Sequence, residues 1–214
     1  ELSYDFLPGT TVNRYCSSSL QTIRMAFHAI KAGEGHAFIS AGVETVSRFC
    51  HGNAHGWPDS KNPLFNDARE RADAAAEGAT EWHDPRQDGH LPDVYIAMGQ
   101  TAENVALYTG ISREDQDHWG VRSQNRAEEA IKSGFFEREI VPVTLPDGTV
   151  VSTDDGPRAG TSYEKISQLK PVFRPNGTIT AGNACPLNDG AAALVIMSDT
   201  KAKELGLTPL ARIV

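Results

Sequence analysis

Residues 10–42 show a strand–helix–strand pattern, which constrains the fold of this chain more than any other part of the sequence. Residues 10–15 are partly β-branched and aromatic, and they lead directly into Cys16. Apolar residues then recur at helical spacing, and Gly33 is placed to end the helix. The apolar run at residues 37–42 has the length of a buried strand. The pattern predicts a βαβ unit with a parallel sheet, and therefore an α/β core.

A long insertion interrupts this core. Residues 49–92 are rich in Gly, Pro, Asn, Asp and His, and a loop of this length is usually functional. Helices are predicted at residues 98–108 and from Ser112 to Gly134, the second with a weak capping-box signal. Residues 146–148, Pro-Asp-Gly, predict the turn of a hairpin.

Strand and helix signals resume near the end of the chain. Residues 178–180 and 191–197 predict buried strands, and residues 198–205 predict a short capped helix. We therefore expect residues 1–48 to begin an α/β core, residues 49–177 to form an α+β insertion domain, and residues 178–214 to return to the core. Because neither end resembles a natural terminus, we expect a segment of a longer protein.

Charge and cysteine content narrow the class of protein. Twenty basic and 28 acidic residues give a net charge of −8, which disfavours nucleic acid and anionic membranes as partners. No apolar run approaches the roughly 20 residues that span a bilayer. The three cysteines are widely spaced and indicate reduced thiols, so we expect a cytoplasmic protein.

Cys16 is the candidate nucleophile. A cysteine between a strand and a helix lies beside backbone N–H groups that lack intrahelical partners, and these groups stabilise a thiolate or a nearby oxyanion. The alternative is that Cys16 is a small buried apolar residue. None of the seven histidines lies in an obvious base motif. His51 and His55 lie beside Cys50, but Gly52 and Gly56 argue against a metal-binding helix, so we predict no metal site.

Five segments resemble conserved motifs of the thiolase family, in the family's order. They are residues 12–20 (VNRYCSSSL), 41–47 (AGVETVS), 98–104 (MGQTAEN), 176–183 (NGTITAGN) and 187–193 (LNDGAAA). The resemblance departs at Ser19 and Ala41, where thiolases usually have Gly, and at Ala97, Cys185 and Pro186. Thiolases consist of two similar α/β halves with an insertion in the first. The resemblance implies that this chain is most of the first half together with the insertion. The family's base, its water-binding asparagine and its second reactive cysteine would then belong to the other half, and this segment alone would be inactive.

The resemblance also implies a chemistry. Cys16 would accept an acyl group from an acyl- or 3-ketoacyl-coenzyme A and pass it to coenzyme A or a second thioester, as in fatty acid metabolism. No metal or redox cofactor is implied, and a homodimer or homotetramer is expected. By alignment to the family's motifs, the residues expected to contact coenzyme A are Met98, Arg158, Lys165, Ala181 and Cys185.

Other interpretations stay open. Met98 could be ordinary core, and Arg158 and Lys165 could be solvated surface charges. The residues after Cys16 weakly favour degradative over synthetic members of the family, and acyl chain length is not indicated. Alternative functions are a ketoacyl-synthase-type condensing enzyme and a thiolase-like protein that binds acyl-coenzyme A without turnover.

Overall fold

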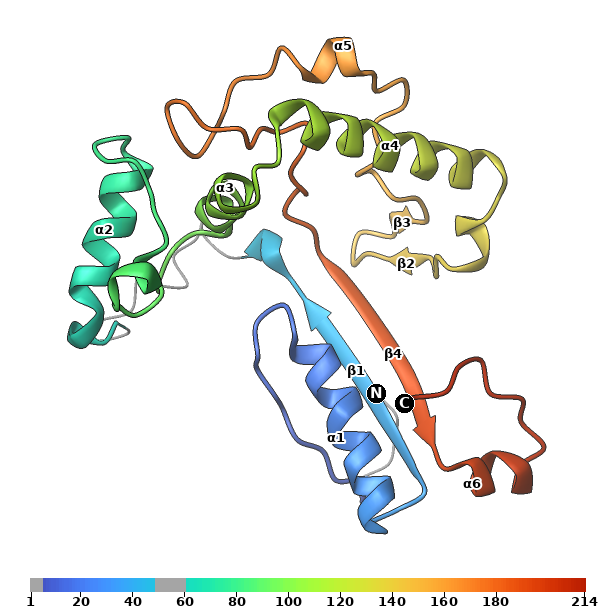
Figure 1. Cartoon of the computed structure of the whole chain (residues 1–214). Coiled ribbons are helices and arrows are strands. Elements are labelled where there is room, and N and C mark those ends of the chain that lie inside the picture. Colours follow the sequence, from blue (N-terminus) through green and yellow to red (C-terminus); the bar gives the residue numbers. More distant parts are fainter. Residues whose placement is uncertain (1–5, 49–60) are drawn as a thin grey trace. The chain divides into compact units, whose positions relative to one another are not determined.

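The computed structural model describes residues 6–48 and 61–214, and the chain forms two compact units (Figure 1). We call Glu1–Cys50 together with Asn188–Val214 the core unit, and His51–Leu187 the insertion unit. Cys50, His51 and His55 lie outside the described residues. No helix in the described ranges is both long and apolar enough to cross a bilayer.

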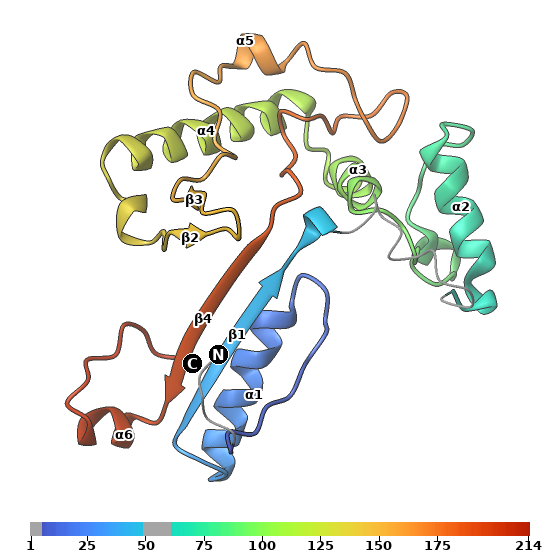
Figure 2. The same cartoon turned by 180° about the vertical axis from the view of Figure 1, so that it is seen from behind.

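The core unit is a helix beside a two-stranded antiparallel sheet (Figures 1 and 2). Helix α1 covers Ser18–Ala32 and ends at Gly33, whose φ of 79° is left-handed, as predicted. Its Thr22 hydroxyl shares a 2.7 Å hydrogen bond with that of buried Ser40 in the sheet. The other elements are β1 (Ala37–Glu44), η1 (Val46–Arg48), β4 (Gly190–Met197) and α6 (Asp199–Glu204).

The predicted parallel βαβ unit is wrong within the described residues. Strand β1 pairs with β4 in antiparallel register, from Ala37 opposite Met197 to Glu44 opposite Gly190. Residues 7–13 adopt no regular structure, because a strand forms only beside a hydrogen-bonding neighbour and this segment has none among the described strands. Residues 178–180 likewise form no strand, and the Val172 amide bonds the Ile179 carbonyl at 3.0 Å.

Apolar residues of the sheet stay exposed within this chain. Ile39 is 57% exposed, Val43 72%, Leu194 51% and Val195 64%. The sequence predicted both strands as buried, because their composition is that of strands covered on two faces. In the described part of the core unit, only one helix packs along β1. The apolar strand residues therefore stay exposed although their composition predicts burial.

The insertion unit is mainly helical. Its helices follow the predicted positions at α3 and α4, which begin at Met98 and Arg113, and Gly110 separates them at a left-handed φ of 69°. The predicted hairpin forms across residues 146–148. The elements are η3 (Pro63–Phe65), α2 (Asn66–Ala76), η4 (Pro85–Asp88), α3 (Met98–Thr109), α4 (Arg113–Lys132), η5 (Phe136–Arg138), β2 (Val143–Thr144), β3 (Val150–Val151) and α5 (Tyr163–Ile166).

The insertion unit ends at Leu187, whereas the sequence placed the end of the insertion at residue 177. Residues 178–183 are held inside the unit by side chains of α3 and α4. Glu103 accepts hydrogen bonds from the amides of Thr178 and Ile179, and Asn183 donates one to Asp117. These contacts join residues that are far apart in the sequence. The local sequence of residues 178–180 therefore predicts a strand and does not indicate the contacts.

Ser112 caps α4 and offers a test of this local structure. Its hydroxyl accepts the Asp115 amide at 3.0 Å and donates to the Asp115 carboxylate at 2.6 Å. Ser112→Ala should lower the free energy of unfolding by about 1 kcal/mol, because an N-terminal amide loses its acceptor. Urea denaturation measures the change. Ser123→Ala, at an exposed position inside α4, is the control and should be neutral or slightly stabilising; equal losses in both variants would contradict the capping role.

Candidate functional site

Cys16 lies in a tight turn immediately before α1, where its side chain is exposed and its thiol is free. The preceding residue, Tyr15, has a φ of 49°, which is uncommon for a non-glycine residue. The amide of Tyr15 donates to Asn13 Oδ1 at 2.9 Å, and the Tyr15 carbonyl accepts the Ser18 amide at 3.0 Å and hydroxyl at 2.6 Å. The Ser18 hydroxyl in turn accepts the Arg14 amide at 2.8 Å. The turn therefore holds Cys16 at the beginning of the helix in a fixed backbone conformation.

The first turn of α1 keeps backbone donors available near Cys16. Ser17 is the N-cap residue, and its side chain makes no capping hydrogen bond. Among the described residues, no backbone carbonyl accepts the amides of Ser19 or Leu20. Such amides carry the positive end of the helix dipole and can stabilise negative charge at the thiol or at an attacked carbonyl oxygen. Cys16 therefore lies where backbone amides can stabilise a thiolate.

Ser19 fits beside Cys16 because Gly42 has no side chain. A Cβ atom built on Gly42 of β1 would overlap the Ser19 hydroxyl. The resemblance places Gly at position 19 in most thiolases, so this chain carries an extra hydroxymethyl group in the space above Gly42. The absence of a side chain at Gly42 is thus what leaves room for Ser19.

Arg158 lies on the loop before α5 and Lys165 lies in α5, and the loop is fastened to α4. The Arg158 amide donates to Gln124 Oε1 at 2.7 Å, and the Gly160 amide donates to Glu128 Oε2 at 3.0 Å. The Lys165 ammonium donates to the Gly160 carbonyl at 2.8 Å, which ties α5 to the loop before it. The side chains of Arg158 and Lys165 are both exposed, as nucleotide phosphates would require.

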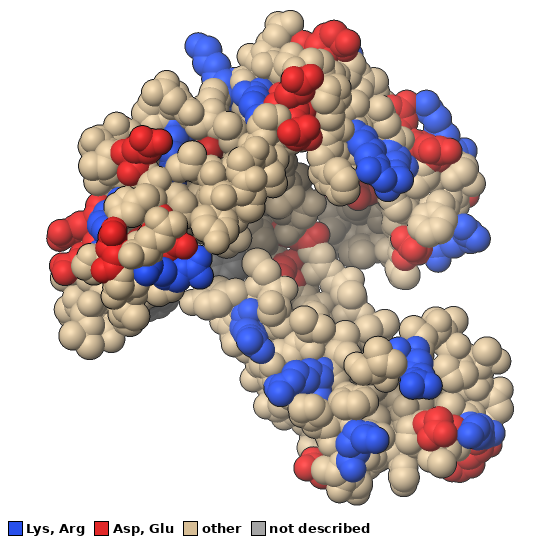
Figure 3. Space-filling view, viewed as in Figure 1, with Lys and Arg blue, Asp and Glu red and all other residues tan. Residues whose placement is uncertain are grey.

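Charge is mixed around these residues. On the face shown in Figure 3, acidic and basic side chains are interspersed over the insertion unit. Glu128 lies beneath the loop, and a hydrogen bond from Lys132, followed by one from the Gly160 amide, lowers the pKa of its carboxyl. Phosphate attraction would therefore be local to the loop rather than a property of the whole surface.

Met98 begins α3 and is 71% exposed, so it is not ordinary core in this chain. Its neighbour Gly99 lies against the ring of Phe173, which a Cβ atom would overlap. Ala97 is the N-cap residue and contributes no side-chain hydrogen bond. A polar residue at that position could cap the helix, so the departure at Ala97 removes a polar group beside Met98.

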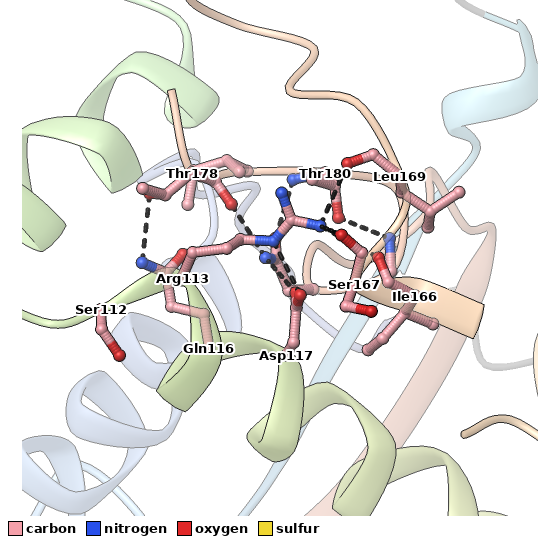
Figure 4. A network of polar contacts seen from close by, with 12 residues as sticks. Ser112, Arg113, Gln116, Asp117, Ile166, Ser167, Leu169, Thr178 and Thr180 are labelled. Carbon is pink, nitrogen blue, oxygen red and sulfur yellow. Dashed lines mark hydrogen bonds and ion pairs between the residues drawn. The ribbon is translucent and has the colours of Figure 1, made fainter. Parts of the chain in front are cut away.

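Ala181 and Cys185 follow the buried Thr180 and are both exposed. Side chains of α4, among them Gln116 and Asp117, lie close to Thr178 and Thr180 of the segment that carries Ala181 (Figure 4). Asn183 accepts the Thr180 amide at 2.8 Å and donates to Asp117 Oδ1 at 2.9 Å. Cys185 is a free thiol, and a thiol is a weaker hydrogen-bonding group than a hydroxyl.

The structure places the five expected coenzyme A residues in the insertion unit and Cys16 in the core unit. A hollow of the insertion unit between α2, α3 and residues 174–178 contains none of them. Sequence reasoning missed the residues that support Ala181, namely Glu103, Arg113, Asp117 and Asn183. Glu103 and Asn183 lie inside motifs resembling the family, whereas Asp117 gave no signal, because a charged residue within a polar helix is expected to face solvent.

The sequence matches the N-terminal domain of thiolases over residues 4–200. The chain belongs to the thiolase family. It is 42% identical over 218 residues to a beta-ketoadipyl-CoA thiolase of Acinetobacter baylyi, and 43% identical over 214 residues to an acetyl-CoA acetyltransferase of Cupriavidus necator. Each match covers 97% of this chain, and the chain spans about half the length of these curated relatives, 51% and 50%.

Solved thiolase structures share the fold. The dimeric peroxisomal thiolase of Saccharomyces cerevisiae matches with a TM-score of 0.72 at 31% identity, covering 94% of this chain and 46% of that one. The acetyl-CoA acetyltransferase of Bacillus anthracis matches with a TM-score of 0.67 at 37% identity, covering 93% of this chain and 48% of that one. The predicted family and the α/β thiolase-like fold are therefore confirmed.

The Ser19–Gly42 contact in this thiolase chain can be tested by a double-mutant cycle. Gly42→Ala should lower the free energy of unfolding by about 1–3 kcal/mol, because its methyl group overlaps the Ser19 hydroxyl. In a Ser19→Gly background the same change should cost clearly less. Urea denaturation of the four proteins gives the coupling energy. Additive effects would show that the two residues do not compete for this space.

Glu128 predicts a pH dependence for the loop that carries Arg158. Because the pKa of Glu128 is lowered in the folded state, its anchoring bond to Gly160 is fully present above the ordinary value of 4.5 and is lost as the pH falls through the lowered pKa. Hydrogen exchange at the Gly160 amide should therefore accelerate, relative to intrinsic rates, in acid. Glu128→Gln should remove most of this dependence. Glu129→Gln, at an exposed position, should leave it intact, and a flat profile in the parent would contradict the anchor.

Proposed function

We propose that this chain provides the acyl-accepting cysteine and the coenzyme A-binding insertion of a thiolase that makes or cleaves 3-ketoacyl-coenzyme A. The observation that carries the proposal is the exposed Cys16 thiol held at the start of α1, beside first-turn amides. The family match and the relatives named as thiolases or acetyl-CoA acetyltransferases support it.

In the cleavage direction, the Cys16 thiolate attacks the 3-keto carbonyl carbon and forms a tetrahedral oxyanion. The amides at the start of α1, including that of Cys16, are the candidates to stabilise this charge. Collapse of the oxyanion breaks the bond between C2 and C3, leaves an acyl group on Cys16, and releases an acetyl-coenzyme A carbanion that takes up a proton. The thiolate of a second coenzyme A then attacks the acyl-enzyme and regenerates Cys16. Synthesis is the reverse sequence, and we favour cleavage on the residues that follow Cys16.

Coenzyme A would lie along the insertion unit. Arg158 and Lys165 would meet the nucleotide phosphates, because both cations are exposed to solvent. Met98, Ala181 and Cys185 would contact the pantetheine arm. The steps transfer an acyl group and protons only, so the proposal includes no metal or redox cofactor. The proton transfers belong to groups outside this chain, and we further propose a cytoplasmic enzyme that acts as a homodimer or homotetramer.

A second candidate is a protein that binds acyl-coenzyme A without turnover. Three departures favour it: the hydroxymethyl group at Ser19, the missing polar N-cap at Ala97, and the thiol at Cys185. A condensing enzyme of the ketoacyl-synthase type has no support in the family match or in the relatives.

Replacement of Cys16 separates these candidates. With acetoacetyl-coenzyme A and coenzyme A, the complete protein should consume the 3-ketoacyl thioester, and Cys16→Ala should lower this rate by at least about a thousandfold, because no other group accepts the acyl chain. Loss of the 3-ketoacyl absorbance measures the rate. Mass spectrometry should show one acyl group on the parent and none on Cys16→Ala.

Cys185→Ala is the matched control, since Cys185 is also a free, exposed thiol. It should keep the acyl adduct, with any change confined to the KM for coenzyme A. Undiminished turnover in Cys16→Ala would refute the mechanism, and tight binding of acyl-coenzyme A by a parent without turnover would favour the second candidate.

A further inference from the structure

We infer that Glu103 of α3 and Asp117 of α4 are positioning residues that hold residues 178–183 in the conformation that presents Ala181 to the pantetheine arm. The inference rests on the proposed function, because it takes coenzyme A as the ligand at Ala181. Neither carboxylate touches the ligand. Each acts through the backbone or side chain of residues 178–183, which we call the return segment.

Glu103 holds the beginning of the return segment. Its side chain is 4% exposed, although a buried carboxylate is costly unless hydrogen bonds satisfy it. The Thr178 amide lies 3.0 and 2.9 Å from the two carboxylate oxygens, and the Ile179 amide donates at 2.9 Å. The Thr178 hydroxyl donates at 3.1 Å and also accepts from Gln116 of α4 at 3.1 Å. These hydrogen bonds to Glu103 require residues 178 and 179 to keep the backbone conformation seen here.

Asp117 holds the end of the return segment. It is fully buried and accepts from Arg113 Nε at 2.7 Å and from Asn183 Nδ2 at 2.9 Å (Figure 4). Asn183 transmits this anchor, since its amide group also donates to the Thr178 carbonyl at 2.9 Å and accepts the Thr180 amide at 2.8 Å. The other end of the Arg113 guanidinium donates to the carbonyls of Ile166, at the end of α5, and Leu169, in the loop that follows, at 2.9 and 3.1 Å.

Close packing leaves the segment little freedom between its two anchors. A Cβ atom on Gly120 of α4 would lie 2.5 Å from the Gly182 carbonyl oxygen, so α4 and the return segment are in backbone contact. A Cβ atom on Gly182 would lie 2.8 Å from Ile166 Cβ. Both contacts are made by Gly182, and Ala181, the residue before it, is exposed. The segment is thus ordered before a ligand arrives, and binding does not have to supply the free energy of ordering it.

Two ligands test this inference on the complete protein by isothermal titration calorimetry. One is coenzyme A, and the other is adenosine 3′,5′-bisphosphate, which has the nucleotide phosphates but no pantetheine arm. Glu103→Gln replaces one acceptor oxygen by an NH2 group that faces the backbone amides of the return segment. It should therefore weaken coenzyme A binding about tenfold. The affinity for the bisphosphate should change less than about twofold. The bisphosphate is unaffected because its loop is anchored separately, through Gln124 and Glu128.

Glu129→Gln is the matched control, the same chemical change at an exposed position of α4, and should alter neither affinity. Thr178→Val removes only the hydroxyl that bridges Glu103 and Gln116, so it gives a milder variant should Glu103→Gln fail to fold. It should weaken coenzyme A binding about threefold with the same selectivity.

The outcomes separate the inference from the proposed function. Parent protein that binds neither ligand would overturn both. Parent protein that binds coenzyme A, together with variants that bind it equally well, would overturn the positioning role alone. Equal weakening for both ligands would also overturn it, because a general loss of structure affects the nucleotide site as much as the pantetheine site.

Discussion

The buried carboxylate of Asp117 is the interaction on which the organisation of the insertion unit depends. It lies on α4, the longest helix of the chain, and has no exposed surface. A charge in that environment is stable only when its donors stay in place, which makes Arg113 and Asn183 obligatory partners. Through these two residues α4 fixes both the loop after α5 and the return segment. Ala181, the coenzyme A residue proposed on the return segment, is therefore supported by this helix.

The core unit depends on a different constraint, the close approach of α1 to β1. The partly buried Thr22–Ser40 hydrogen bond ties the two elements, and Gly42 leaves room for Ser19. Just beyond the Glu44–Gly190 pair, the Ser47 amide and hydroxyl donate to Asp189 at 2.8 and 2.6 Å, which joins the residues after β1 to those before β4. The start of α1, where Cys16 lies, is thus attached to a sheet whose strands come from opposite ends of the chain.

Helices were predicted well because their signals are local. Ser112 and Gly110 lie within a few residues of the ends they determine, and the apolar spacing of α1 repeats every turn. The sheet was predicted less well, because strand direction depends on a partner that the sequence does not identify. Residues 10–15 and 178–180 have strand-like composition but find no strand to pair with among the described residues. Composition indicated that a residue could be in a strand, and the available neighbours decided whether it was.

The sequence by itself determined the family, the candidate nucleophile Cys16 and the positions of the main helices, because short motifs and helix ends are encoded by adjacent residues. Only the tertiary structure decided that β1 and β4 run antiparallel, that Lys165 folds back to the Gly160 carbonyl, and that Glu103 and Asp117 are buried. Burial of a charge depends on donors contributed by residues more than 60 positions away, at distances of 66 and 75 along the chain. No pattern within a single helix specifies such partners, since the same residues on an isolated helix would be solvated.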